Sequence, residues 1–303
     1  MTTDAVAVGL LAGADLSRAA ALEALPIDSL WTGGHVASRN PSPEVMASLA
    51  RLSAVTERVQ LGTAVLLLPL YPPAVIAKQV ADLDRATGGR IVLGVGVGGE
   101  YPQEFRACGV PVEERGARTD EAIPLLRRLW SAEEITHDGR HYPMRDVRIH
   151  PAPAQTGGPP IVVGGRKGAA LRRAARLGDG WMPYLCSPRR YADGAQQIRA
   201  LAHEDGRDLA GYGWYAFVFV GIDADGRRAR ETAARFLGGT YEQDFQAMVD
   251  NVTASGTVDE VVERLGAFVD AGARHLVLCP VGDTDAVVDQ LATHVIPRVR
   301  THT

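Results

Sequence analysis

Residues 91–99 read Ile-Val-Leu-Gly-Val-Gly-Val-Gly-Gly, and this stretch decides between two α/β folds. Its first half is apolar throughout, as in a strand covered on both faces. Its second half matches the G-x-G-x-x-G pattern of a dinucleotide-binding turn, which requires a helix starting directly on the glycines. Here we expect a long loop over residues 100–105 instead. We interpret the glycines as a close approach of backbone to a flat or anionic group, with a purely structural bend as the alternative.

Outward from this stretch, short β-rich runs alternate with amphipathic helical patterns. Such alternation predicts parallel strands joined by right-handed crossovers. Eight strand–helix units in 303 residues favour a closed (β/α)8 TIM barrel, and an open doubly wound sheet is the alternative. The predicted strands are residues 5–11, 28–32, 59–67, 91–97, 161–163, 180–183, 214–222 and 275–278.

Two segments depart from simple alternation. A long connection, residues 98–114, follows the fourth strand, and Asp138-Gly139 later predicts a hairpin turn. After the seventh strand, residues 225–271 are expected to be helical with a break near Ser255-Gly256. We therefore predict a single-domain α/β barrel, residues 1–303, with an insertion after strand 4 and an extended helical region after strand 7. The other predicted helices are residues 15–24, 43–55, 72–89, 115–130, 167–176, 188–203 and 283–295.

Composition and charge are those of an ordinary globular protein, with 46% hydrophobic and 22% charged residues. The net charge is −4 and no lysine- or arginine-rich block occurs, which argues against a nucleic-acid partner. Three scattered cysteines do not suggest a disulfide framework. Neither a signal peptide nor an apolar run of roughly 20 residues is visible, so we expect a cytoplasmic protein without a membrane partner.

A second glycine pair lies in Gly164-Gly165-Arg166-Lys167, between the fifth strand and its helix. Flexible backbone, a helix N-terminus and two cations together predict an anion site, most simply for a phosphate. The alternative is a plain strand–helix turn with two exposed basic residues.

A histidine, His35, follows Gly33-Gly34 at the end of the second strand. The carboxyl ends of barrel strands carry the chemistry in this fold, so His35 is a candidate for acid–base work or for a cofactor hydrogen bond. An incidental loop histidine is the alternative. His137 and His141 are four apart, but the turn between them breaks helical ligand spacing, and no metal site is expected.

Five aromatic residues fall at or just beyond predicted strand ends. Gathered around one mouth, they would suit a flat ring system. Ordinary packing in the core and at the rim is the alternative. We take them as a candidate substrate pocket: Trp31, Tyr71, Tyr101, Trp181 and Tyr184.

A series of short motifs along nearly the whole chain resembles the luciferase-like flavin and deazaflavin oxidoreductases. Each motif is weak alone, but their order and spacing are specific. They are Leu30-Trp31 with Gly34-His35, Leu61–Val65, Pro73-Ala74 to Lys78-Gln79, Arg90–Gly98 with Glu104-Phe105, Arg115–Arg118, Leu129-Trp130, His141-Tyr142, Pro160–Gly165, Leu177–Trp181 and Gly256–Glu260.

The resemblance implies a (β/α)8 barrel that binds FMN or the deazaflavin coenzyme F420 in its mouth, and it is greatest to the F420-dependent branch. In that branch a bulge in strand three, often with a non-proline cis peptide, backs the ring. Backbone after strand four contacts the coenzyme, and the glycine pair after strand five holds its phosphate. The matching residues are Ala64, Val65, Val97, Gly98, Gly99, Gly164 and Gly165, with Arg166 and Lys167 adjacent.

The activity implied is hydride transfer between the deazaflavin and a small organic substrate, with His35 near the reactive ring carbon and Glu100 a further candidate for proton transfer. The first alternative is an FMN monooxygenase that uses reduced flavin and oxygen. The second is a non-catalytic flavin-binding barrel. The implied partners are the substrate, a second copy in a homodimer, and a separate flavin or F420 reductase.

The chain departs from the sugar-phosphate dehydrogenases of the F420 branch at its candidate site. Gly34 stands where those enzymes have an aspartate before the histidine. Gly99 aligns with their catalytic glutamate, and Glu100 is one place later. Their phosphate-gripping lysines have no clear match. These departures argue against a sugar-phosphate substrate.

Overall fold

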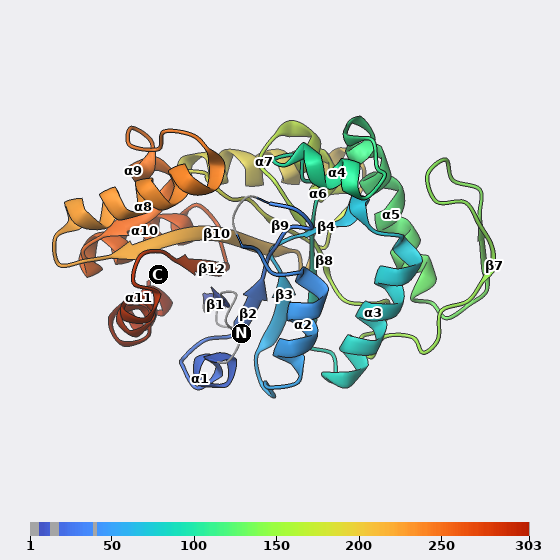
Figure 1. Cartoon of the computed structure of the whole chain (residues 1–303), viewed down its shortest axis with the longest axis horizontal. Helices are drawn as coiled ribbons and strands as arrows, with labels where there is room; N and C mark the ends of the chain where they lie inside the picture. Colours follow the sequence, from blue (N-terminus) through green and yellow to red (C-terminus); the bar gives the residue numbers. More distant parts are fainter. Residues whose placement is uncertain (1–5, 13–17, 39–40, 303) are drawn as a thin grey trace.

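The computed structural model describes residues 6–12, 18–38 and 41–302, in which parallel strands close a barrel inside a layer of helices (Figure 1). Each barrel strand pairs parallel with the next barrel strand along the chain, and the parallel pairing of the last one with the first closes the ring. The predicted closed barrel is confirmed. Its strands are β1 (Ala7–Leu11), β2 (Ser29–Thr32), β3 (Gln60–Thr63), β5 (Ile91–Gly96), β8 (Ile161–Gly164), β9 (Gly180–Met182), β10 (Gly213–Ile222) and β12 (His275–Pro280).

Helices cover the outside of this ring, and side chains at their first turns explain where several begin. Ser187 and Asp225 accept hydrogen bonds from backbone N–H groups two or three residues on, and Thr257 with Glu260 forms a capping box. The covering helices are α1 (Ala19–Glu23), α2 (Val45–Ser53), α3 (Pro73–Ala86), α5 (Arg115–Leu129), α6 (Gly168–Leu177), α7 (Pro188–Glu204), α8 (Gly226–Tyr241), α10 (Val258–Asp270), α11 (Thr284–Gln290) and α12 (Ile296–Arg300). None of the described helices combines the length and apolar character that crossing a membrane requires.

The connection after β5 is not the loop that the sequence suggested. Residues 102–107 form a short helix, α4 (Pro102–Ala107), and a 3-10 turn follows at Val112–Glu114. Pro102 suits a first helical turn, and Phe105 anchors the helix in an apolar cluster with Leu67 and Leu70. The expectation of a loop over residues 100–105 was wrong from residue 102 onward, because Pro102 begins a helix there.

The hairpin predicted around Asp138-Gly139 is present. β6 (Ile135–His137) pairs antiparallel with β7 (Met144–Val147). The hairpin extends away from the barrel beside α5 (Figure 1). The segment belongs to the connection between α5 and β8.

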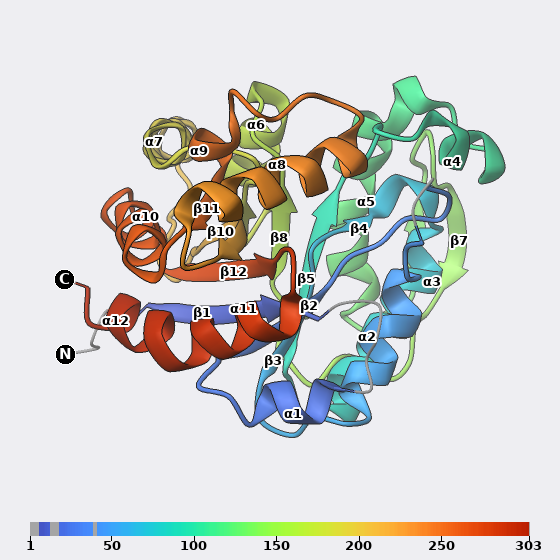
Figure 2. The same cartoon turned by 60° about the vertical axis from the view of Figure 1, so that its left-hand side comes forward.

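The region after β10 is not helical throughout. It contains α8, the short α9 (Val249–Val252) and a strand, β11 (Thr253–Gly256), which pairs parallel with β10 outside the ring (Figure 2). The predicted break at Ser255-Gly256 is therefore the end of a strand. The four residues of β11, Thr-Ala-Ser-Gly, are small and do not form the apolar run that marks a buried strand. The last predicted helix is likewise divided, because a π-helical turn at Leu291–Val295 separates α11 from α12.

Strand three is interrupted at the Ala64–Val65 peptide bond, which is cis and not followed by proline. A short strand, β4 (Leu66–Leu67), resumes after it and pairs with β5. The bulge expected from the family resemblance is therefore present at the expected residues.

Large side chains fill the barrel interior at its amino-terminal end. Trp31 is fully buried and faces Gly62, where a Cβ atom would lie 2.3 Å from the indole ring. The Trp31 indole N–H donates to the Ser29 hydroxyl at 2.7 Å, and Ser29 Oγ lies 2.7 Å from Nε2 of His275. The Tyr215 ring stacks on His275 with centroids 4.8 Å apart. This end of the barrel is closed by side-chain packing.

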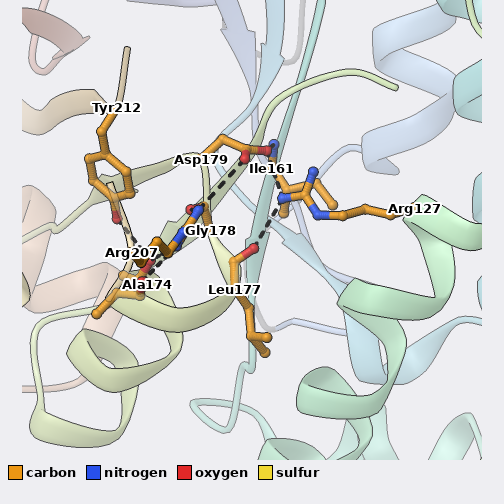
Figure 3. Close-up of polar contacts among 9 residues, drawn as sticks. Arg127, Ile161, Ala174, Leu177, Gly178, Asp179, Arg207 and Tyr212 are labelled. Carbon is orange, nitrogen blue, oxygen red and sulfur yellow. Dashed lines mark hydrogen bonds and ion pairs between the residues drawn. The ribbon is translucent and has the colours of Figure 1, made fainter. Parts of the chain in front are cut away.

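A polar network ties together the amino-terminal ends of β8 and β9 (Figure 3). The Asp179 carboxylate accepts hydrogen bonds from the backbone N–H of Ile161 at 2.9 Å and from Arg127 at 2.7 Å. Arg207 donates to the carbonyl groups of Ala175 and Gly178 at the end of α6. Asp179, which belongs to the Leu177–Trp181 motif, therefore holds β8 and β9 together at the amino-terminal face of the barrel. In this fold, that face contributes to stability.

Candidate active site

The opposite end of the barrel, its mouth, is lined on one side by glycines that surround the Ala64–Val65 bulge. A Cβ atom at Gly33 would lie 2.6 Å from the Ala64 carbonyl oxygen. Cβ atoms at Gly96 and Gly164 would lie 2.5 and 3.1 Å from the side chain of Val65. Larger residues at these strand ends would displace the bulge, so the glycines allow it to stand in the mouth.

The turn after β5 requires glycine for its backbone conformation. Gly98 and Gly99 have φ values of 64° and 120°, which residues with a side chain rarely adopt. Gly98 packs against Leu67 and Phe105. A purely structural bend, the alternative interpretation of these glycines, is therefore sufficient to explain the turn itself. Contact of Val97, Gly98 and Gly99 with a coenzyme stays a prediction.

His35 lies at the rim, in contact with Ser42 and with the α4 segment, which contains Tyr101 and Glu104. Its backbone N–H donates to the Ser42 hydroxyl at 2.9 Å. Its Nδ1 lies 3.3 and 3.4 Å from the two carboxylate oxygens of Glu104 on α4. Its ring meets Tyr101 edge-on, with centroids 4.8 Å apart. The His35 side chain is 29% exposed, whereas Glu104 is fully buried.

The position before His35 has no room for a side chain. A Cβ atom at Gly34 would lie 1.9 Å from the Pro43 carbonyl oxygen. An aspartate there, as in the sugar-phosphate dehydrogenases, would require the backbone around Pro43 to move. The backbone around Pro43 therefore excludes a side chain at position 34.

Sequence reasoning missed Glu104 as a site residue. The Glu104-Phe105 pair was noted only as one motif among several, and its segment was expected to be a loop. The available signal was Pro102, which can start a helix and so place Glu104 in its first turn.

Glu100 joins a second cluster across the mouth. The Tyr184 hydroxyl donates to Glu100 Oε1 at 2.7 Å, and the Arg166 guanidinium lies over the Tyr184 ring at 4.7 Å. Burial, with the Glu100 carboxylate next in effect, raises the pKa of Tyr184 to about 12. Tyr184 therefore keeps its proton at neutral pH and serves as a hydrogen-bond donor.

The end of α8 contacts both rim clusters. The Tyr101 hydroxyl donates to the Thr240 carbonyl at 2.8 Å. The Tyr184 and Tyr241 rings lie 6.3 Å apart. The extended region after β10 thus reaches the mouth, where it contacts residues that follow β5 and β9.

The five aromatic candidates do not gather around one opening. Tyr101 and Tyr184 are partly exposed at the mouth, while the Tyr71 hydroxyl donates to Glu44 at 3.1 Å, beside α2. Trp31 is buried in the barrel interior. Trp181 is only 1% exposed; its indole N–H donates to the Gly165 carbonyl at 2.7 Å and its ring packs outward against α7. For the two tryptophans, the core-packing alternative describes their surroundings.

The turn after β8 has the features that a phosphate site needs. Gly165 has a φ of 113°, and Lys167 is the N-cap residue that precedes α6. The exposed side chains of Arg166 and Lys167 lie next to the backbone amides of this ten-residue helix. These residues fit an anionic group of a coenzyme. Among the described residues, no group of three His, Cys, Asp or Glu side chains is placed to hold a metal ion.

The other side of the mouth is apolar, which sequence reasoning did not identify. Leu11 at the end of β1 and Phe217 on β10 are partly exposed, and both belong to two apolar clusters at once. Tyr241 of α8 joins one of them. The mouth therefore has a glycine side, formed by Gly33, Gly96 and Gly164, and an apolar side, formed by Leu11, Phe217 and Tyr241.

A closed barrel with these features is found in a known protein class. The family model for luciferase-like monooxygenases matches residues 13–296. The chain therefore belongs to the luciferase-like monooxygenase family.

Two relatives illustrate the range of sequence similarity. An uncharacterized protein of Mycobacterium bovis is 42% identical over 142 residues, which are 47% of this chain and 48% of that protein. This match thus spans about half the length of that relative. The F420-dependent glucose-6-phosphate dehydrogenase of Beutenbergia cavernae is 32% identical, and the alignment covers 89% of this chain and 85% of the enzyme.

Two solved structures share the fold over nearly the whole chain. An F420-dependent secondary alcohol dehydrogenase, in complex with an F420–acetone adduct, superposes with a TM-score of 0.86 at 20% identity, covering 97% of this chain and 99% of the other. The oxygenating constituent of 3,6-diketocamphane monooxygenase from Pseudomonas putida, in complex with FMN, has a TM-score of 0.76 at 18% identity, with the same coverage of 97% and 99%. At these identities the likeness concerns the fold alone.

Proposed function

We propose that the chain is an oxidoreductase that uses coenzyme F420 to transfer a hydride to or from a small organic substrate. The observation that carries the proposal is the mouth itself, in which His35 stands at the rim and the Ala64–Val65 bulge lies among glycines. The relative that aligns over 89% of this chain, named as F420-dependent, supports the choice of coenzyme.

Each part of the coenzyme has a proposed seat. The Ala64–Val65 bulge backs the ring, and the backbone of Val97, Gly98 and Gly99 borders it. The turn Gly164–Gly165, with Arg166 and Lys167, binds the phosphate through backbone amides and positive charge. The deazaflavin supplies hydride chemistry when bound, while the protein orients the reactants and excludes water.

His35 is the proposed group for moving the substrate proton, since an imidazole can both accept and donate a proton and this one is partly exposed at the rim. Glu100 is the weaker candidate. One of its carboxylate oxygens already accepts the Tyr184 hydroxyl, which favours a role in holding Tyr184 and the Arg166 beside it.

The proposed substrate is a small organic molecule without a sugar phosphate. The lack of space for a side chain at Gly34 supports this choice, as does the apolar side of the mouth around Leu11 and Phe217. Glucose 6-phosphate, named for the Beutenbergia relative, serves as the comparison compound.

An FMN monooxygenase is the second candidate, because the family model is named for monooxygenases and the Pseudomonas structure holds FMN. That activity would call for a separate reductase as partner. A homodimer and a cytoplasmic location stay predictions for either function. A non-catalytic flavin-binding barrel is less favoured, since it would not need a buried carboxylate beside a rim histidine.

An anaerobic assay tests the proposal. Purified protein is incubated with F420 and a panel of secondary alcohols, or with reduced F420 and the matching ketones, while coenzyme absorbance is followed. We expect turnover on part of the panel and little on glucose 6-phosphate. Absence of coenzyme turnover, together with oxygen-dependent product formation from reduced FMN, would contradict it in favour of the monooxygenase.

A further inference from the structure

The carboxylate of Glu104 is fully buried, which makes it an unusual part of this mouth. Withdrawing a carboxylate from water costs several kcal/mol unless a partner compensates it. The described partner of its oxygens is Nδ1 of His35, at 3.3 and 3.4 Å. The pairing joins residues 69 positions apart and brings α4 against the end of β2.

The other described groups around the pair do not replace this partner. Tyr101 meets the His35 ring edge-on, and Ser42 binds the His35 backbone. Burial, and then the nearby Glu104 carboxylate, raises the pKa of the Cys108 thiol. Tyr71, whose pKa is raised mainly by burial, also keeps its proton. None of these groups brings positive charge to the carboxylate, whereas the His35 ring does when protonated.

We propose that Glu104 is the positioning residue of His35, an inference that rests on the proposed function above. The buried carboxylate accepts the Nδ1 proton, which selects one tautomer and leaves Nε2 as the nitrogen for proton transfer. The edge of Tyr101 supports the ring in that orientation.

When the substrate is an alcohol, its hydroxyl proton and its carbinol hydride must go to two different acceptors. Nε2 of His35 would accept the hydroxyl proton, F420 bound in the mouth would supply the acceptor for the carbinol hydride, and the substrate would become a carbonyl compound. Glu104 stabilises the imidazolium that results, and the reverse direction returns the same proton. Removing the carboxylate should therefore slow turnover without loosening coenzyme binding.

The chain offers a matched control at the hairpin. Glu121 lies 3.1 Å from Nε2 of His137, and these side chains are 15% and 21% exposed. This carboxylate–histidine pair joins α5 to β6, away from the residues of the mouth. Glu121→Gln therefore removes a similar charge from a similar pair without touching the proposed site.

The experiment compares the wild type with Glu104→Gln and Glu121→Gln. Nitrogen-15 NMR of labelled histidines, in protein without coenzyme and with neutral rings, reports which nitrogen of His35 carries the proton. We expect Nδ1–H in the wild type and loss of that preference in Glu104→Gln. The same variant should lose about 10²–10⁴-fold in kcat while the F420 Kd stays unchanged. Glu121→Gln should alter His137 and also His141, whose backbone N–H donates to the same carboxylate, and should leave His35 and kcat as in the wild type.

An Nε2–H tautomer of His35 in the wild type overturns the inference, even if Glu104→Gln does not fold. An unchanged tautomer, or an unchanged kcat, in folded Glu104→Gln also overturns it. Absence of F420 turnover in the wild type contradicts the proposed function instead. The tautomer measurement does not depend on turnover, so it still tests the His35–Glu104 interaction.

Discussion

Histidines stand at both ends of the barrel, in opposite surroundings. His275 begins β12 at the closed end, where it is buried beside Ser29 and stacked on Tyr215, and burial lowers its pKa to about 4. His35 follows β2 at the mouth, partly exposed and beside the carboxylate of Glu104. The same residue type is a neutral packing element at one end and a candidate for proton transfer at the other.

The contrast extends to the rest of each end. Large rings and the Asp179 network close the amino-terminal end, whereas glycines and a buried carboxylate line the mouth. We infer that stability and chemistry are separated along the barrel axis. Substitutions at the closed end should therefore lower stability and leave turnover unchanged.

The largest effect is expected at the rim. His35→Ala should lower kcat by about 10²–10⁴-fold, because the proposed proton-transfer group is lost. The F420 Kd should stay near the wild-type value, while the free energy of unfolding should fall by about 1–3 kcal/mol, because the buried Glu104 carboxylate loses its described partner. Steady-state kinetics, equilibrium titration and urea unfolding check the three quantities. Unchanged turnover would remove His35 from the mechanism.

The closed end should respond to pH in its stability. Below pH 6.5 the unfolded chain protonates His275, whereas the folded chain resists protonation until about pH 4. The free energy of unfolding should therefore decrease as the pH falls through this window, by about 3 kcal/mol from this residue. Urea unfolding of the wild type and of His275→Gln at both pH values isolates this contribution. Equal pH dependence in the two proteins would show that His275 is not its source.

Breaking the Asp179 network should lower the free energy of unfolding by a smaller amount. Asp179→Ala leaves the backbone N–H of Ile161 and the Arg127 guanidinium without their carboxylate partner, so stability should fall by about 1–3 kcal/mol. Asp179→Asn keeps an acceptor oxygen and should cost less. Thermal unfolding measures both, and kcat should be unchanged for the fraction that is folded. A stable but inactive Asp179→Ala protein would break the proposed separation of the two ends.

The smallest effect is expected at the phosphate turn. Lys167→Ala should weaken F420 binding by about 0.3–1 kcal/mol, because one exposed cation near a helix N-terminus contributes little. The loss should shrink at high salt. Arg172→Ala, an exposed cation further along α6, serves as the control. An equal loss for both variants would indicate a general charge effect and not a site.

The barrel could be predicted because each of its units leaves a local signal. Apolar runs, proline starts and glycine ends recur along the chain, and the order of motifs added the cis peptide at Ala64–Val65. β11 left no such signal because its residues are small. The faces of Trp31 and Trp181 depend on strand register, which local patterns do not determine.

The His35–Glu104 pair lay beyond local reasoning for a further reason. It joins two segments 69 residues apart, and Glu104 was assigned to a loop that proved to be α4. The burial of the Glu104 carboxylate and its pairing with His35 are visible only in the tertiary structure. The positions of the glycine turns were predicted, but the approach of a flat or anionic group to their backbone stays a prediction, because it depends on the ligand.

A coenzyme titration tests whether the mouth of the barrel binds F420 in preference to FMN. Purified protein is titrated with F420 and, separately, with FMN, and the quenching of fluorescence is followed to saturation. We expect micromolar or tighter binding of F420 that is clearly stronger than the binding of FMN and is weakened when Gly164→Val displaces the bulge in the mouth. Binding of FMN alone, or F420 binding unaffected by Gly164→Val, would contradict it.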